Sequence, residues 1–453
     1  MPLECATLKE TCSRRRKEHM LQSVRIVSPV TTMLAGVQWL FFMFANTVVI
    51  PISIGNAFHM TSPVVTASLE RAFIYTGIAC ILQILIGHRL PLMEGHAGIW
   101  WGVILSLAAS AQSSGQSLQA VGGSLEVGII LSGLLVGILG IVGIGWWLRR
   151  LFNPIVTGTF YFLLAAQLIQ IFFKGMIGLA NGTIIQPQIA LLSFALVILV
   201  MALSIWGRGM VSNFALLIGI VVGWIAFRLI FPGQIQTLAA ADNAFFAIFP
   251  WGQPAGDIGI ILAVIFTGLI STSNTFASLE GIKTLYNAPA SPTQYQRSLA
   301  ITGLSSIVSG LLGLVPYAPY TSSLGFLRTT RILDRIPFII GAALFILLGT
   351  IPVLGQLFAS LPVSVGDAVL FVAYLQLFGA ALSNIEQTQF TYKTIYRLAT
   401  PVLFGLALLA TPASAFSSVP ATLRPLLQNG LVMGILLAIL LEHTIRWEPQ
   451  NKK

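Results

Sequence analysis

The sequence predicts an all-α polytopic membrane protein with 14 transmembrane segments, arranged as two inverted 7-segment repeats. Three observations predict this fold class: the composition, the succession of apolar segments, and the placement of the basic residues. Of the 453 residues, 56% are hydrophobic and only 8% are charged, whereas a soluble domain carries about 25% charged residues. The mean hydropathy of +0.88 is in keeping with this. The core of a soluble protein cannot bury so many apolar residues, so we expect the chain to lie in a lipid bilayer.

Apolar segments follow one another from the end of a polar, basic N-terminal stretch. Their limits are set by hydrophobic runs and by the breaks between them. They cover residues 31–55, 67–87, 90–111, 126–148, 154–174, 187–207, 213–231, 256–279, 297–315, 318–334, 337–357, 363–384, 399–412 and 424–443. Four of the 14 are short or broken, so hydropathy by itself gives between 11 and 14 spans.

The basic residues fall in alternate connections. If the N-terminus is cytoplasmic and 14 segments cross, then 20 of the 24 Lys and Arg residues lie on the cytoplasmic side, and the exceptions are Arg71, Lys174, Arg228 and Arg424. Cytoplasmic loops carry the excess of basic residues in membrane proteins. We therefore expect both termini in the cytoplasm and the chain in the plasma or inner membrane. The net charge of +10 reflects this topology and indicates no nucleic-acid partner.

The third segment contains LPLMEGHAGIWWG, which cannot be an ordinary helix interior. Pro91 lacks a backbone donor, Gly95 and Gly98 weaken a helix, and Glu94 and His96 are ionisable. Non-helical backbone survives in a bilayer only where protein covers it or where it lines a polar cavity. Glu94 is the one carboxylate that we place deep in the membrane, and the break beside it predicts a binding site near the midplane.

The tenth segment is interrupted in a similar way. Aligning the stretch from Thr76 with the stretch from Thr302 pairs a Thr-Gly with a Thr-Gly, and a one-residue slip brings Pro91 opposite Pro316. Apolar segments broken by Pro and Gly at corresponding places in two halves are typical of secondary transporters with internal repeats.

These stretches resemble one family. The first segment, GVQWLFFMFANTVVIP, and the tenth, YTSSLGFLRTTR, are similar to those of the nucleobase/ascorbate transporters, also called the uracil/xanthine permease or nucleobase:cation symporter-2 family, and nearest to its purine permease branch. The resemblance implies a secondary active transporter of nucleobases, with purines preferred, driven by proton symport. It implies substrate bound between core segments 1, 3, 8 and 10, short crossed strands in segments 3 and 10, and a homodimer.

The resemblance also implies alternating core and gate parts. They comprise a polar cytoplasmic segment at 1–25, core segments 1–4 at 26–150, gate segments 5–7 at 151–255, core segments 8–11 at 256–360, gate segments 12–14 at 361–445 and a cytoplasmic tail at 446–453.

Several family positions carry different residues here. Ser271 stands where relatives have Glu, Thr275 where they have Asp or His, and Ser322 and Ser323 replace a Glu or Gln followed by Asn. Glu94 is expected to take over from the missing Glu, either by accepting purine N–H groups or by carrying the proton. The alternative is a structural carboxylate that caps backbone amides or lies nearer the cytoplasmic mouth.

The other candidates bring hydrogen-bonding groups or an aromatic ring. An Asn amide both donates and accepts, which suits a purine edge, and a tyrosine can stack on the purine ring. The candidate substrate-binding residues are Gln38, Glu94, Gly98, Ser271, Asn274, Thr275, Tyr320, Ser322, Ser323 and Gly325. Glu94 and His96 are the candidates for proton coupling, although a neutral His96 that hydrogen-bonds while facing the gate is the favoured interpretation of that residue.

Other functions compete with this prediction. An uncoupled nucleobase facilitator fits the missing carboxylates, and an anion transporter of the sulfate-permease type would share the architecture. We expect no enzyme, because the chain contains no His-Glu-x-x-His, Cys-x-x-Cys or nucleophile-elbow pattern. No cofactor and no metal site are predicted, and the absence of a P-loop motif argues against ATP-driven pumping.

Overall fold

The computed structural model describes most of the chain. The described residues are 29–143, 153–179, 184–234, 245–386, 388, 391–420, 423–445 and 447. The predicted cytoplasmic segment at 1–25, and the tail at 446–453 apart from residue 447, lie outside the described residues.

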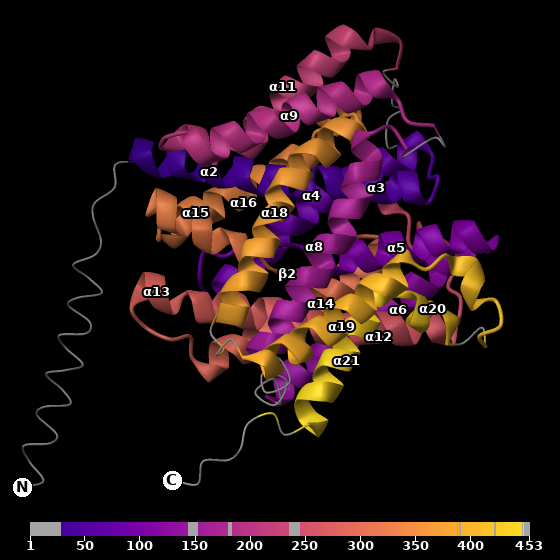
Figure 1. The fold of residues 1–453 in the computed structure, drawn as a ribbon. Helices are drawn as coiled ribbons and strands as arrows, with labels where there is room; N and C mark the ends of the chain where they lie inside the picture. Colours follow the sequence, from indigo (N-terminus) through magenta and orange to yellow (C-terminus); the bar gives the residue numbers. More distant parts are fainter. Residues whose placement is uncertain are drawn as a thin grey trace, which may run out of the picture.

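Helices make up nearly all of the described chain, and Figure 1 shows their arrangement. In the first half they are α2 (Pro29–Thr47), α3 (Val49–Ala57), α4 (Ser62–Leu85), α5 (Gly98–Ser114), α6 (Leu118–Val142), α8 (Pro154–Met176), α9 (Pro187–Trp206), α10 (Met210–Asn213) and α11 (Ala215–Ile230). In the second half they are α12 (Ile258–Gly281), α13 (Lys283–Tyr286), α14 (Pro292–Leu312), α15 (Ser322–Thr330), α16 (Arg335–Gly349), α17 (Pro352–Ala359), α18 (Val363–Glu386), α19 (Tyr392–Ala410), α20 (Arg424–Gln428) and α21 (Gly430–Thr444).

Every predicted apolar segment contains helix, but not every helix is long enough to span a bilayer alone. Within the described ranges, eight helices are long and apolar enough to cross, or nine if α16 and α17, which meet at an 87° bend, form one span. Three shorter apolar helices are α5, α11 and α21. The chain is therefore a multi-pass membrane protein.

Several helices begin earlier than the apolar segments predict. Helix α14 starts at Pro292 instead of residue 297, because Ser291 forms a capping box with Gln294. Helix α19 starts at Tyr392, because the side chain of Thr391 accepts a hydrogen bond from the backbone of Thr394. Polar caps satisfy the free N–H groups of a first turn, so these helices extend past the hydrophobic stretch.

The two short strands predicted in segments 3 and 10 are present. Strand β1 (Glu94–His96) pairs with β2 (Tyr317–Pro319) in an antiparallel two-stranded sheet. The register places Glu94 opposite Pro319 and His96 opposite Tyr317. Each strand stands between two helices, α4 and α5 for β1 and α14 and α15 for β2.

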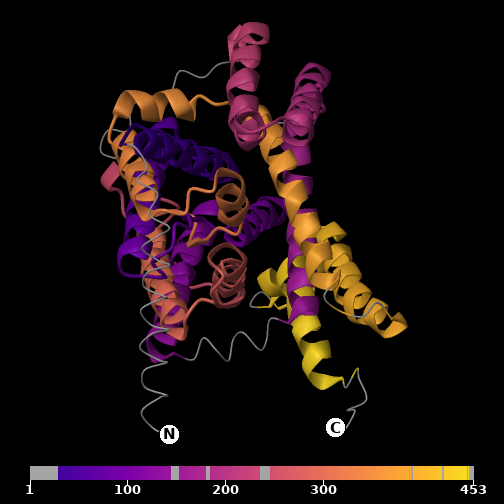
Figure 2. The same ribbon diagram turned by 90° about the vertical axis from the view of Figure 1, so that its left-hand side faces the viewer.

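The helices pack into two groups, which Figure 2 shows side by side. In the first group α6 packs on α14 and α12, while α16 packs on α4 and α2. In the second group α18 packs on α8 and α9, and α21 packs on α19 and α8. The strand pair contacts α4, α12 and α14 and so belongs to the first group.

Glycines let α6 and α14 approach closely. A Cβ atom added at Gly303 would lie 2.4 Å from the backbone nitrogen of Gly137, whereas one added at Gly137 would lie 3.9 Å from its nearest neighbours. We expect Gly303→Ala to destabilise the protein by about 1–3 kcal/mol through overpacking, and the same change at Gly137 to leave stability unchanged. Thermal unfolding in detergent measures both variants, and equal melting temperatures would contradict this packing.

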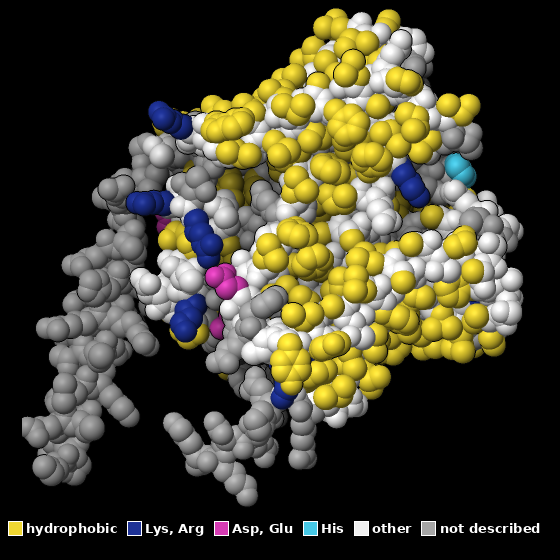
Figure 3. All heavy atoms as spheres, viewed as in Figure 1, with side chains coloured by type: hydrophobic (Ala, Val, Ile, Leu, Met, Phe, Trp, Pro, Cys, Tyr) yellow, Lys and Arg dark blue, Asp and Glu magenta, His cyan; other side chains and the backbone are white. Residues whose placement is uncertain are grey.

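The surface carries many apolar side chains. Figure 3 shows them over the face that carries α9, α11 and α19, and among them Leu191 is 73% exposed and Leu229 is 77% exposed. A soluble protein rarely leaves so large an apolar face uncovered. Most of the Lys and Arg side chains visible in Figure 3 lie at its left edge, near α13 and α15.

Candidate substrate site

Backbone hydrogen bonds extend the pairing of β1 and β2 beyond both ends of the two strands. Beyond β1, the Ala97 N–H donates to the Pro316 carbonyl at 2.9 Å, and beyond β2 the Tyr320 N–H donates to the Met93 carbonyl at 2.8 Å. The Met93 N–H donates to the Ser323 hydroxyl oxygen at 3.1 Å. The buried side chain of Ser323 thereby ties the start of α15 to the residue before β1.

Successive residues of β1 face opposite sides of the sheet. Glu94 and His96 share one face, and both are buried. Gly95 faces the other way, where an added Cβ would lie 3.2 Å from the ring of Tyr320. The two ionisable residues of the third segment therefore point away from the side of β1 that Tyr320 covers.

The Glu94 carboxylate lies against helices α4 and α14. Thr302 donates its hydroxyl to Glu94 Oε1 at 2.6 Å, and Gln83 donates its amide to Thr302 at 3.2 Å. The backbone N–H of Glu94 lies 3.3 Å from the sulfur of Cys80. The second carboxylate oxygen, Oε2, has no hydrogen-bond partner among the described residues. The carboxylate thus has one strong partner and one vacant acceptor, without a basic residue bonded to it in the described chain.

His96 points into the first helix group and not toward the second. Its Nδ1 lies 2.6 Å from the Val315 carbonyl oxygen, which fixes the ring beside β2. The ring packs on Tyr317 with centroids 4.7 Å apart. These described contacts of His96 lie within the first helix group.

Helix α12 presents a stripe of polar side chains toward the strands. Ser278 donates its hydroxyl to the Pro319 carbonyl at 3.0 Å. Asn274 precedes it by four residues, and Ser271 and Thr275 occupy the same face at helical spacing. The hydroxyls of Ser271 and Thr275 are buried without a hydrogen-bond partner within the described ranges, and Asn274 is partly exposed. Buried polar atoms normally find partners, so this stripe is suited to a polar ligand.

The start of α5 faces the second helix group. A Cβ atom added at Gly98 would lie 3.2 Å from the hydroxyl oxygen of Tyr374 on α18. The first N–H groups of a helix lack partners within it, and Gly98 leaves them uncovered by a side chain. At the start of α15, Ser322 and Gly325 are exposed. The two helix starts therefore lie at opposite ends of the antiparallel strand pair, and a tyrosine of the second group lies beside the start of α5.

Asn46 on α2 is a residue of the site that sequence reasoning missed. Its backbone oxygen lies 3.4 Å from the hydroxyl oxygen of Tyr320. The same hydroxyl donates to the His96 carbonyl at 2.5 Å. Gln38 precedes Asn46 by eight residues, about 12 Å along the helix. Its buried Oε1 has no hydrogen-bond partner in the described residues, and no described contact joins Gln38 to the strands.

Glu94 is not the only carboxylate buried in this protein. Glu126, Glu70 and Asp367 are also buried, at 0%, 4% and 3% exposure. Asp367 lies on α18 against Gly175 of α8, and Arg71 on α4 interacts electrostatically with both Glu126 and Glu70. The positive-inside count uses Lys and Arg and gives no position for these carboxylates. The available signal was that each is an isolated charge within or beside an apolar segment.

Broken apolar segments that meet as strands within one of two helix groups, beside vacant polar groups, are the features of a secondary transporter. The model of the xanthine/uracil permeases, described as "Permease family", matches residues 30–414. The chain belongs to this family.

The relatives it resembles are bacterial permeases. The chain is 28% identical over 434 residues to the "Putative purine permease YwdJ" of Bacillus subtilis, covering 92% of this chain and 97% of that protein. It is 25% identical to the uric acid permease PucJ of Bacillus subtilis, with 90% of each chain covered. It is also 25% identical to the uric acid transporter UacT of Escherichia coli, with 92% and 86% covered.

Solved structures of the same fold are transporters of other families. The transmembrane domain of the cyanobacterial bicarbonate transporter BicA superposes with a TM-score of 0.57 at 15% identity, covering 90% of this chain and 96% of that one. The murine anion transporter Slc26a9 gives a TM-score of 0.60 at 10% identity, covering 92% and 68%. At these identities the likeness establishes the fold alone.

Proposed function

We propose that this protein is a secondary active transporter of nucleobases, with purines preferred, that works by proton symport. The substrate lies beside the strand pair, among α2, α5, α12 and α15. The names of the relatives, which include uric acid permeases, support purines as the substrate class. Membership of the permease family supports transport and not catalysis.

The observation that carries the proposal is the polar stripe of α12. Ser271 and Thr275 offer buried hydroxyls without partners, and Asn274 adds an amide that both donates and accepts. A purine presents donors and acceptors on its edges and an aromatic face. Tyr320 supplies the ring that stacks on this face. Gly98 leaves the first backbone N–H groups of α5 uncovered by a side chain and open to ring oxygens, while Ser322 and Gly325 are exposed at the start of α15. Gln38 has a supporting role along α2.

The proposed mechanism moves the second helix group against the first. The first group is the core and the second is the gate, with the boundaries that the sequence predicts, and the 14 segments form two inverted repeats. The order helix, strand, helix at both α4–β1–α5 and α14–β2–α15 supports the repeat, as does the antiparallel pairing of the strands. Exposed Lys283, Arg328 and Arg331 beside the start of α2 support a cytoplasmic location for that face and both termini, in the cell membrane. A homodimer is part of this proposal.

Glu94 is the proposed coupling residue. Placing a charged carboxylate at the bilayer centre costs about 2.5–3.5 kcal/mol of free energy, so a proton bound to Glu94 removes an unfavourable charge. It also changes the hydrogen bond that Thr302 donates to this carboxylate. This couples the proton to the strand that adjoins the substrate. A facilitator without coupling is the second candidate, because Ser271 and Thr275 stand where relatives carry ionisable side chains.

Uptake into proteoliposomes tests the proposal. Labelled adenine, guanine, hypoxanthine, xanthine, uric acid and uracil are supplied one at a time, with and without an inward proton gradient. We expect purines to accumulate above equilibrium only with the gradient, and excess unlabelled purine to compete. Vesicles without protein are the control for leakage.

The outcomes separate the candidates. Equilibration at the same rate with and without the gradient identifies a facilitator. Uptake of bicarbonate or sulfate in place of every base would contradict nucleobase transport and favour the anion transporter.

A further inference from the structure

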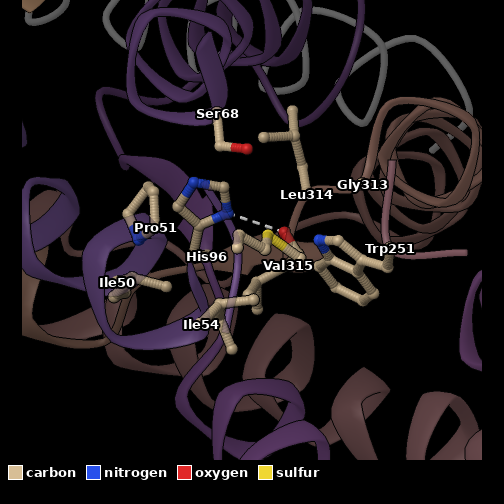
Figure 4. A pocket seen from close by; sticks show the side chains of 10 residues that line it. Ile50, Pro51, Ile54, Ser68, His96, Trp251, Gly313, Leu314 and Val315 are labelled. Atoms are coloured by element: carbon tan, nitrogen blue, oxygen red, sulfur yellow. Dashed lines mark hydrogen bonds between the residues drawn. The ribbon is translucent and has the colours of Figure 1, made fainter. Parts of the chain in front are cut away.

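A cavity lies behind β1, on the side of the strand pair away from the substrate site. Figure 4 shows it lined by α3, by Ser68 of α4, by His96, by the turn that precedes β2 and by Trp251. It has room for a water molecule. Of its lining residues only Met60, in the connection between α3 and α4, is partly exposed. The cavity therefore runs from that connection to the imidazole of His96.

The ring of His96 presents an acceptor to this cavity. A carbonyl oxygen can only accept, so the hydrogen bond at 2.6 Å to Val315 requires the proton on Nδ1. In the neutral ring Nε2 is then a lone-pair acceptor. His96 is 1% exposed, and its Nε2 has no hydrogen-bond partner in the described part of the chain. A buried acceptor of this kind implies a bound donor.

Ser68 supplies the donor group on the opposite wall. Arg71 donates through Nη2 to the Ser68 hydroxyl oxygen at 3.1 Å, and because arginine has no acceptor, the hydroxyl hydrogen of Ser68 is not used in that bond. Figure 4 shows this hydroxyl directed into the cavity above His96. A water bound between the two would accept from Ser68 and donate to Nε2.

Trp251 closes the cavity, and two charged side chains hold it in place. Its backbone N–H donates to Glu126 Oε1 at 3.1 Å, and its ring stacks on Phe58 with centroids 5.7 Å apart. Arg71 binds the same segment through the carbonyls of Phe245 and Ala247, at 3.3 and 3.1 Å. Residues 245–251 are thus held over the cavity by residues from α4 and α6.

We propose that this cavity is the proton-entry site of the transporter, in which water passing Met60 and Ser68 delivers a proton to Nε2 of His96. A hydronium ion in the cavity gives its proton to the Nε2 lone pair, leaving water and an imidazolium that keeps its Nδ1–H bond to Val315. The inference rests on the proposed proton symport and adds where the proton enters. The entrance lies at the end of α3, and the start of α2 lies at the other end of the same first segment. In the proposed topology the start of α2 is cytoplasmic, so the entrance opens on the extracellular face.

The titratable groups around His96 come from four elements. Glu94 shares its face of β1, Tyr317 stands opposite it on β2, and Cys80 lies on α4 beside the strand. Beyond the cavity are Arg71 of α4 and Glu126 of α6, which reach it through Ser68 and Trp251. Glu94 lies two residues before His96 on the same face of β1. Its carboxylate is the nearest group in the strand that can accept the proton from His96.

The test compares two transport modes in the same proteoliposomes. Gradient-driven accumulation of a labelled purine requires proton entry, whereas exchange against unlabelled purine does not require net proton movement. The variants are His96→Gln, which keeps an amide donor for Val315 but has no titratable group, and Ser68→Ala. Exposed His443→Gln and buried Ser305→Ala are the matched controls.

We expect His96→Gln to reduce accumulation by about tenfold or more, within the usual range of coupling between sites, while exchange stays near the wild-type rate. Ser68→Ala should slow accumulation less, and the two controls should not change it. Loss of both modes in His96→Gln would mean a structural role and overturn the proposal. Unchanged accumulation in His96→Gln would also overturn it while leaving symport intact. If the wild type exchanges purines but does not respond to the gradient, both symport and this proton site fail, and nucleobase transport stands.

Discussion

Replacing Glu94 by Gln is expected to abolish gradient-driven accumulation of the substrate while leaving exchange measurable. The Gln side chain retains an oxygen that accepts from Thr302, so the hydrogen bond at 2.6 Å is preserved. It cannot bind or release a proton. The variant therefore separates the shape of this site from its charge, and proteoliposome uptake with and without a proton gradient measures the difference.

The matched control is Glu280→Gln, which neutralises an exposed carboxylate at the end of α12. We expect it to accumulate substrate as the wild type does. Thr302→Val provides a second comparison, because it removes the hydroxyl that donates to Glu94. Its accumulation should fall while its fold persists. Normal accumulation by Glu94→Gln would exclude Glu94 from coupling and leave it as a structural residue.

Replacing Asn274 by Ala is expected to raise the KM for the preferred purine about tenfold to a hundredfold, which corresponds to the loss of a hydrogen bond worth about 1.5–3 kcal/mol. Asn274 lies on the stripe of α12 that faces β2 through Ser278. It is partly exposed and bonds to no described residue, so its amide is available to the substrate.

Asn384→Ala is the control for this prediction. Asn384 lies on α18 and satisfies its amide by donating to the Ala380 carbonyl of its own helix at 2.8 Å. We expect the KM to stay at the wild-type value in this variant. A KM unchanged in Asn274→Ala would remove α12 from substrate recognition, and a fall in maximal rate alone would place Asn274 in the conformational change.

Sequence reasoning located the parts of the site that depend on local chemistry. Pro91 and Gly95 predict a break in an apolar segment, and β1 lies at that break. The run of polar residues that starts at Ser271 can be recognised within an apolar segment. Helical spacing then places Ser271, Asn274 and Thr275 on one face of the helix. Other parts were inaccessible: Asn46 and Tyr374 are ordinary residues of apolar helices, and only their neighbours make them part of the site.

Hydropathy and backbone breaks are properties of short stretches, so the amino-acid sequence alone is enough to assign the class of the protein and the order of its elements. The directions of the key side chains depend on tertiary contacts. Adjacent strand residues face opposite sides, so a pairing register is needed before Glu94 can be assigned to a face, and its partner Thr302 lies 208 positions away. The same holds for His96, whose cavity is closed by Trp251 from a segment far along the chain. Such contacts are made by packing between distant helices, and no local pattern encodes them.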